Sequence, residues 1–136
     1  MIDTSRFAHP KRTTPSKEDR KRERDARDRR FREAVWARDG AKDRATGAVL
    51  ERSHEDWDRR GQVAHLLSRR AHPEVRCNTS NGVLLSDHMH QLSDHRGGRL
   101  LRLTDPETGD LATDANKPIR FTLYDRAGRV VWERIS

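Results

Sequence analysis

The sequence predicts a small mixed α+β fold, and three observations support this prediction. A long, strongly charged segment lies near the N-terminus, short apolar runs of strand length follow it, and one of these runs leads through a capping serine into a short helical segment. The 136 residues are 38% charged and 32% hydrophobic, which suffices for one small domain with a tail and a small apolar core.

The first two segments of the chain are residues 1–15 and 16–39. Residues 1–15 contain two prolines and three threonines without apolar periodicity, which predicts a disordered leader. Ser16, followed by acids at 18 and 19, is typical of a helix N-cap, so we expect a charged helix from Ser16 to Arg38. Its first half is expected to be solvated. The apolar residues expected to pack are Phe31, Ala34, Val35 and Ala37.

The rest of the chain is expected to divide into a core, residues 40–98, and a C-terminal β-strand extension, residues 99–136. In the core, two short strands over 62–67 and 83–85 flank a long loop. A helix over 87–95 follows, capped by Ser86 and ended by the glycines at 97 and 98. In the extension, strands are expected over 99–103, 119–124 and 130–132, with a hairpin turn over 125–128.

Positive charge is concentrated at the N-terminus. Residues 1–35 hold 12 of the 29 Lys and Arg residues but only 7 of the 22 Asp and Glu residues. Attraction to nucleic-acid phosphate and simple solubility would both explain such an excess. We therefore expect the Arg-rich helix either to lie along a DNA duplex or to be a solvated arm.

Several classes of protein are disfavoured by composition. No stretch reaches the roughly 18–20 apolar residues of a membrane span, and the first residues lack the apolar region of a signal peptide. A cytoplasmic protein without a membrane partner is expected. Cys77 is the only cysteine, which excludes an internal disulfide and a Cys-x-x-Cys zinc site. Any metal site would use imidazole, carboxylate and amide groups.

Histidines cluster in the core, where six of the seven lie between positions 54 and 95. The helix expected over 87–95 places His90 and Asp94 four positions apart, so that both side chains project from one face and can share a cation. Imidazole with carboxylate suits Mg²⁺, Mn²⁺, Ni²⁺ or Zn²⁺. The alternative is a surface His-Asp pair on a polar helix.

The segment from Val63 to Asp94 resembles the HNH endonuclease family. The family's ββα-metal unit supplies a His, an Asn and a His in that order. Here an apolar strand carries His65, the loop ends at Asn81-Gly82 before an apolar triplet, and His90 follows nine positions after Asn81. Asp94 stands where many members have a second His and one subgroup has Asp. The resemblance covers residues 36–98, including Trp36 to Gly40, which is similar to the segment preceding the site in phage and bacterial members.

The resemblance implies a ββα-metal core with the charged helix and a C-terminal β-hairpin attached, and metal-dependent hydrolysis of DNA phosphodiester bonds. His65 is then the general base, Asn81 orients the loop backbone around it, and His90 with Asp94 holds a single divalent metal ion. Each residue also has a plainer interpretation. His65 would be a half-buried strand histidine, and Asn81-Gly82 would be a common turn dipeptide. His88 and His95 are alternative candidates for the metal-ligand positions assigned to His90 and Asp94.

Two departures from the family pattern concern the metal and the support of the site. Ala64 occupies a position where many members place a metal ligand, and the Cys-x-x-Cys clips are absent, so Trp36 and Trp57 are expected to support the site. DNA phosphates are expected to meet Arg69, Arg70, Arg76 and Arg96. A catalytically weak or inactive DNA-binding accessory protein of the same fold is the main alternative function, and a structural zinc-bound module is a third.

Overall fold

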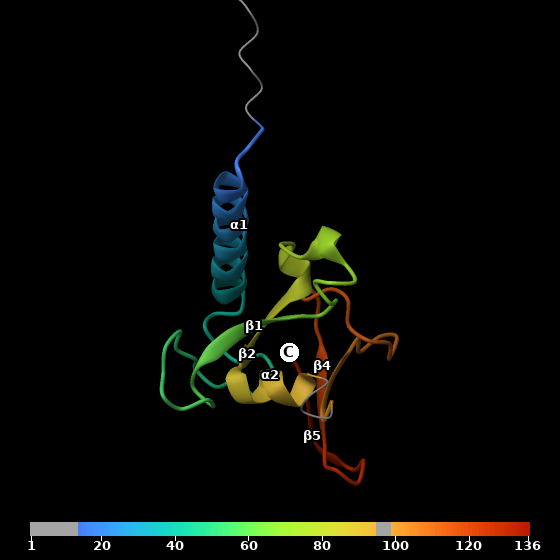
Figure 1. The fold of residues 1–136 in the computed structure, drawn as a ribbon. Helices are drawn as coiled ribbons and strands as arrows, with labels where there is room; N and C mark the ends of the chain where they lie inside the picture. Colours follow the sequence, from blue (N-terminus) through green and yellow to red (C-terminus); the bar gives the residue numbers. More distant parts are fainter. Residues whose placement is uncertain (1–13, 95–98) are drawn as a thin grey trace, which may run out of the picture.

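The computed structural model describes residues 14–94 and 99–136 and has a mixed α+β architecture (Figure 1). The predicted fold class is therefore confirmed at this level. The expected leader, apart from its last two residues, lies outside the described residues, as do His95 and Arg96. The helices are α1 (Lys17–Arg38) and α2 (Asp87–Ser93), with 3-10 turns η2 (Pro73–Val75) and η3 (Thr79–Asn81). The strands are β1 (Gly61–His65), β2 (Gly82–Ser86), β3 (Leu101–Thr104), β4 (Arg120–Tyr124) and β5 (Val130–Ile135).

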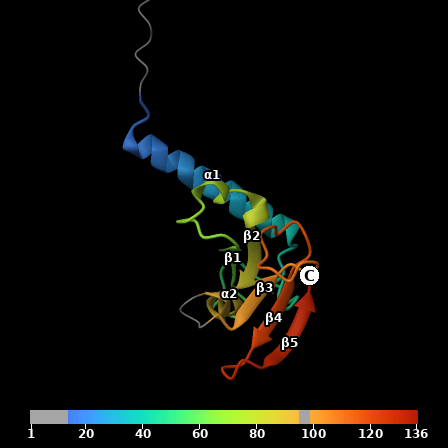
Figure 2. The ribbon, with the colours of Figure 1, turned by 90° about the vertical axis from the view of Figure 1, so that its right-hand side faces the viewer.

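Helix α1 begins at the predicted cap. The Ser16 hydroxyl accepts a hydrogen bond from the Asp19 amide at 3.1 Å, and the Asp19 carboxylate accepts one from the Ser16 amide at 3.3 Å. This reciprocal capping box satisfies amides that the first turn would leave unpaired. The first half of α1 is mostly exposed, as expected, and projects beyond the sheets (Figure 2). In the described part of the chain, no helix is long and apolar enough to cross a membrane.

The packing face of α1 differs from the prediction. Phe31 and Val35 are buried, but Ala34 and Ala37 are exposed, and Trp36 is buried in their place. The indole of Trp36 is long enough to contact β1 from the side of the helix, whereas the methyl groups of Ala34 and Ala37 are too short. Gly61 makes this contact possible, since a Cβ at that position would lie 2.7 Å from the Trp36 ring.

The antiparallel pair β1 and β2 separates two apolar clusters. Because side chains alternate between the faces of a strand, Val63 and Leu84, which pair across the sheet, face α1, while Ala64 and Val83 face the opposite side. The α1 cluster contains Phe31, Val35, Trp36, Leu50 and Leu84. The opposite cluster joins α2 to the sheet of order β3-β4-β5 through Met89, Leu101, Ile119 and Phe121.

Strand ends were predicted less accurately than strand positions. β1 stops at His65 rather than at residue 67, because the Asn81 side chain replaces a partner strand at Leu67. Gly82 is not in a turn but is the first residue of β2, with an extended φ of −113°. Its missing side chain admits Phe31, whose ring would lie 2.6 Å from an added Cβ. The C-terminal hairpin turn is confirmed, with Gly128 at φ +81°.

Charged side chains fasten the end of α1 to β2. The Asp39 carboxylate accepts a hydrogen bond from the Leu84 amide at 2.9 Å and pairs with Arg38, whose guanidinium also donates to the Thr79 carbonyl at 2.6 Å. Asp43, only 1% exposed, accepts from the amides of Ala45 and Ser86. Buried carboxylates with several amide donors fix backbone segments relative to one another. The segment Trp36 to Gly40 is thus structural.

Candidate functional site

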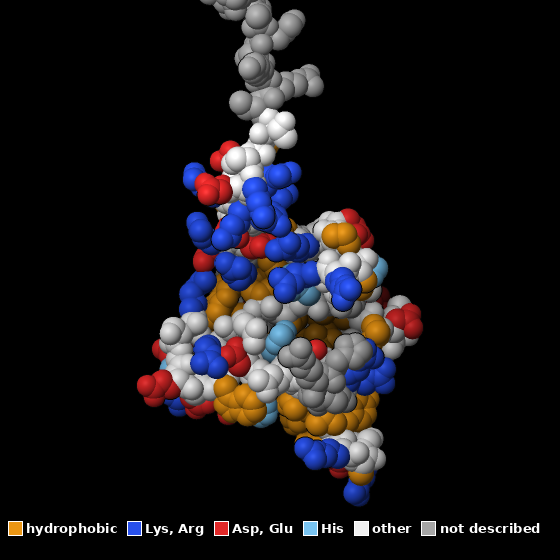
Figure 3. Space-filling model, in the orientation of Figure 1, with side chains coloured by type: hydrophobic (Ala, Val, Ile, Leu, Met, Phe, Trp, Pro, Cys, Tyr) orange, Lys and Arg blue, Asp and Glu red, His pale blue; other side chains and the backbone are white. Residues whose placement is uncertain are grey.

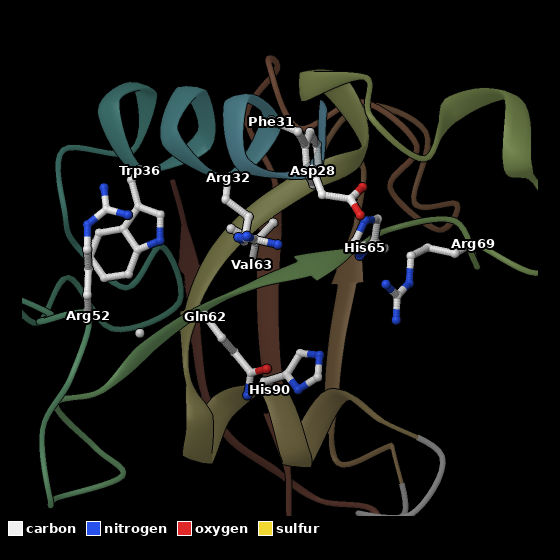
Figure 4. Close-up of a pocket in the computed structure, with 11 residues that line it drawn as sticks. Asp28, Phe31, Arg32, Trp36, Arg52, Gln62, Val63, His65, Arg69 and His90 are labelled. Carbon is white, nitrogen blue, oxygen red and sulfur yellow. The ribbon is translucent and has the colours of Figure 1, made fainter. Parts of the chain in front are cut away.

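A cavity of about 410 Å³ opens between α1, β1 and α2. His65, at the end of β1, and His90, from α2, both line it, and Figure 4 shows His65 on the side of α1 and His90 on the side of α2. The structure therefore brings together two of the sequence-predicted site residues. The remaining lining residues are Asp28, Phe31, Arg32, Trp36, Arg52, Gly61, Gln62, Val63 and Arg69.

The His65 imidazole is held on two sides. Its ring stacks on Phe31 with the centroids 5.2 Å apart and the planes 28° apart, and its Nε2 lies 3.2 Å from the Arg76 carbonyl oxygen. A carbonyl oxygen only accepts hydrogen bonds, so Nε2 carries the proton in the neutral ring. The lone pair is then on Nδ1, which is the atom able to accept a proton from water.

Electrostatics favour the neutral form of His65. Partial burial lowers the pKa of the imidazole below its ordinary value, and the positive charge of Arg69 lowers it further. The hydrogen bond to the Arg76 carbonyl and the negative charge of Asp28 oppose this shift without reversing it. His65 is therefore both half-buried, as its plainer interpretation requires, and an available base at neutral pH.

Asn81 makes the backbone contacts expected of an orienting residue. Its Oδ1 accepts a hydrogen bond from the Leu67 amide at 2.7 Å, and its Nδ2 donates to the Leu67 carbonyl at 3.1 Å. The side chain is 1% exposed, so the two bonds are shielded from water. They hold the backbone two residues beyond His65. Its role in catalysis stays a prediction.

His90 and Asp94 are arranged differently from the prediction. Helix α2 is capped by Ser86 but ends at Ser93, where the hydroxyl donates to the His90 carbonyl at 2.7 Å, so Asp94 is the C-cap with extended backbone. A serine hydroxyl bonded to a carbonyl of the last turn competes with continuation of the helix. The predicted extension of the helix to residue 95 was therefore wrong, and Asp94 is exposed at the helix end, although its amide still donates to the His90 carbonyl at 3.1 Å. The role of His90 and Asp94 as metal ligands stays a prediction.

The environment of His90 still suits a metal ligand. Burial lowers the pKa of its imidazole, opposed by the charges of Asp94 and Asp87, so the ring is neutral at pH 7. Within residues 14–94 and 99–136, however, no three His, Cys, Asp or Glu side chains form a group able to hold a metal ion. The donor set of one imidazole and one carboxylate fits a weakly held divalent ion that takes its other ligands from water or substrate.

Ala64 lies on the face of β1 that packs toward α2. The residue is 6% exposed and packs with Met89 in the cluster on the α2 side of the sheet. A carboxylate or imidazole at this position would face α2, the helix that carries His90. The sequence-predicted departure thus leaves a methyl group on the face where the family resemblance implies a ligand.

Sequence reasoning missed Asp28, which lies beside His65 in the cavity (Figure 4). Its carboxylate pairs with the Arg76 guanidinium at 2.7 Å and accepts a hydrogen bond from the Cys77 thiol at 3.3 Å. Because Asp28 precedes Phe31 by three positions, helical periodicity would have placed both on one face. The Cys77 pKa is raised by burial and by Asp28, which keeps the thiol protonated.

The arginines expected to meet DNA fall into different situations. Arg69 lines the cavity, and with Arg70 and Arg76 it also borders a shallow hollow of about 460 Å³ in the loop after β1. Arg76 was expected to contact DNA, but its guanidinium is paired with Asp28 and is not freely available. Arg96 lies outside the described residues. Figure 3 shows Lys and Arg side chains gathered over α1 and the neighbouring loop, above the histidines.

His88 does not share the arrangement of His90. Its Nδ1 lies 2.7 Å from an Asp58 carboxylate oxygen, and its ring stacks on Trp57 with centroids 4.2 Å apart. It therefore faces the loop before β1 rather than the metal position. Trp57 is 42% exposed and belongs to neither apolar cluster, so the expectation that its packing supports the site was wrong. The contact of its indole is with the His88 ring at the surface.

The site combines a neutral imidazole with a free Nδ1, a second neutral imidazole beside a carboxylate, and surrounding guanidinium groups. This combination can remove a proton from water next to a polyanion. Comparison of the chain with protein-family models, curated proteins and solved structures found no match.

Proposed function

We propose that the protein is a metal-dependent endonuclease that hydrolyses DNA phosphodiester bonds, with β1, β2 and α2 forming a ββα-metal unit. The observation that carries the proposal is that His65, with its proton on Nε2, shares one cavity with His90. The order and spacing of His65, Asn81 and His90 support it, as does the basic rim. Phosphodiester hydrolysis needs a base, a cationic environment and stabilisation of the leaving oxygen. His65 and the arginines support the first two, and a metal ion on His90 and Asp94 would supply the third.

In the proposed mechanism, His65 Nδ1 takes a proton from a water molecule, whose oxygen then attacks the phosphorus. The bond from phosphorus to the 3′ oxygen breaks, and that oxygen departs with the bonding electrons. Arg69 and Arg32 line the cavity and would neutralise the phosphate oxygens. A divalent ion held by His90 and Asp94 would stabilise charge on the phosphate and on the 3′ oxygen.

Positioning residues keep the base in its reactive form. The Arg76 carbonyl holds the Nε2 proton, and the Phe31 ring limits rotation of the imidazole. Asn81 fixes the backbone that follows His65. A base that is oriented in advance needs no reorganisation when the substrate binds.

The direct test is cleavage of supercoiled plasmid by the purified chain with Mg²⁺, Mn²⁺, Ni²⁺ or Zn²⁺, compared with His65→Ala. We expect cleavage that requires metal and falls by about 10²-fold or more in the variant, the usual contribution of a general base. His72→Ala is the matched control, because His72 lies in the loop after β1, outside the cavity. Equal nicking by all three proteins would indicate a contaminant and reject the proposal.

A second candidate function is a DNA-binding accessory protein without catalysis. Ala64, buried where a ligand would face α2, favours it. This candidate requires DNA binding with intact plasmid in every metal. A structural zinc module would instead unfold when zinc is chelated.

A further inference from the structure

The face by which α1 packs on the sheet continues beyond the sheet as a basic face. Phe31 is buried against β2, and the residues four and seven positions before it are Arg27 and Arg24, which a helix places on the same side. Both arginines are exposed, because α1 projects past the strands there (Figure 2). Arg24 and Arg27 thus lie on the same side of α1 as Phe31, but beyond the point where the helix contacts the strands.

Arginines of the described chain divide into structural and unengaged groups. Structural ones are Arg38 and Arg44, which bond to backbone carbonyls, and Arg60 and Arg76, which pair with Asp87 and Asp28. By contrast, several arginine side chains within residues 14–94 and 99–136 make no hydrogen bond or salt bridge. Four of these unengaged arginines line cavities beside α1, namely Arg24, Arg27, Arg32 and Arg69.

The four unengaged arginines line two adjoining hollows. A second cavity, of about 690 Å³, lies between α1 and the loop carrying η2 and η3, and Arg24 and Arg27 line it. Asp28 lines both this cavity and the one that holds His65, so the two meet at that residue. Asp28 is paired with Arg76, and Glu74 is the other acid lining the second cavity. We call the two cavities together the α1 groove.

We propose that the α1 groove binds the phosphate backbone of double-stranded DNA without reading its sequence. Guanidinium groups match phosphate oxygens in pairs, and unengaged arginines lose no internal contact when they bind. The 22 residues of α1 span about 33 Å at 1.5 Å per residue, close to one turn of duplex at about 34 Å, so a straight helix suits a regular duplex. Cleavage of the bound DNA rests on the proposed function, whereas binding of the duplex does not depend on it.

The test measures binding of the full chain to a labelled duplex of about three helical turns, without metal, at salt concentrations from about 50 to 200 mM. Arg24→Gln/Arg27→Gln removes two charges from the groove. Arg22→Gln/Arg29→Gln removes two charges from the opposite side of the same helix, where both residues are also exposed. Circular dichroism checks that α1 stays helical in both, which glutamine should permit.

We expect the groove variant to bind about tenfold more weakly and to lower the slope of log affinity against log salt by about 2, with little change in the opposite pair. Equal losses in the two pairs would show that net charge alone matters and would overturn the proposal. Absence of duplex binding, or tighter binding of a single strand, would also overturn it.

The same assay separates this inference from the proposed nuclease. His72→Ala should bind duplex as the unaltered chain does, because His72 lines neither cavity of the groove. Groove-dependent binding together with intact plasmid in every metal would reject the nuclease and uphold the groove. Metal-dependent cleavage with equal loss of binding in both arginine pairs would uphold the nuclease and reject the groove.

Discussion

The two ends of the His65 cavity are built to different degrees. At the His65 end, a ring, a carbonyl and a buried amide hold the imidazole and the backbone beyond it. At the His90 end, the accompanying Asp94 is exposed beyond the helix, and Ala64, on the face of β1 toward α2, carries only a methyl group. The difference indicates that the proposed base is positioned before substrate arrives, whereas the proposed metal site is completed by water and substrate.

Breaking the ordered end should produce the largest effect. Asn81→Ala removes two shielded hydrogen bonds and leaves the Leu67 amide and carbonyl without these partners. We expect a loss of about 3 kcal/mol in the free energy of unfolding, measured by urea denaturation. Asn116→Ala, at an exposed residue bonded to Arg38, should cost under about 1 kcal/mol. A similar cost for both variants would contradict an anchoring role for Asn81.

Filling the open end sharpens the comparison in the opposite direction. Ala64→Asp places a carboxylate on the side of the sheet that faces α2. We expect about tenfold tighter Mn²⁺ binding by calorimetry and a lower melting temperature without metal, because the charge is buried. Ala64→Asn has nearly the same shape without the charge and should not gain affinity. Unchanged Mn²⁺ affinity in Ala64→Asp would show that the position does not face the metal.

The pH dependence follows from the lowered pKa values of both cavity histidines. In the pH range between the lowered pKa of these histidines in the folded chain and about 6.5, the unfolded chain binds more protons than the folded chain. In this range the free energy of unfolding therefore increases with pH, and this stability is lost as the pH falls. Cleavage should likewise keep its activity at neutral pH and decline only below about 6.5. NMR titration of the His65 ring checks this, and a midpoint above 6.5 would contradict it.

A smaller effect is expected where α1 meets the His65 end. Asp28→Asn breaks the salt bridge with Arg76. Arg76 also supplies the backbone carbonyl that is bonded to the His65 ring. We expect a loss of about 0.5–1 kcal/mol in stability and a lower pKa for His65, because a nearby negative charge is removed. Nitrogen NMR of the ring would also show a less uniform Nε2-protonated form.

Asp25→Asn is the control for that change, since Asp25 is an exposed acid of the same helix. It should leave both the His65 pKa and its tautomer unaltered. If the two variants shift the His65 titration equally, the effect comes from the general charge of α1, and a specific role for the Asp28 pair is rejected.

Local patterns predicted the elements well but not the contacts between them. Ser16 and Ser86 marked both helix starts because a cap is a bond within a few residues. The pair Asp28 and Arg76, 48 positions apart, depends on how the loop folds back on α1, which no local pattern encodes. Trp36 replaced Ala34 in the packing face because only the tertiary arrangement tells which flank of the helix meets a strand.

The Phe31 contact sets a limit on how short a working version of this protein can be. A truncation beginning at residue 40 would keep His65, Asn81 and His90 but would discard the ring on which His65 stacks. It would also bare Leu84, now covered by α1, to solvent. Such a fragment should therefore aggregate or rearrange, and grafting the three motif residues alone onto another scaffold should not transfer the site.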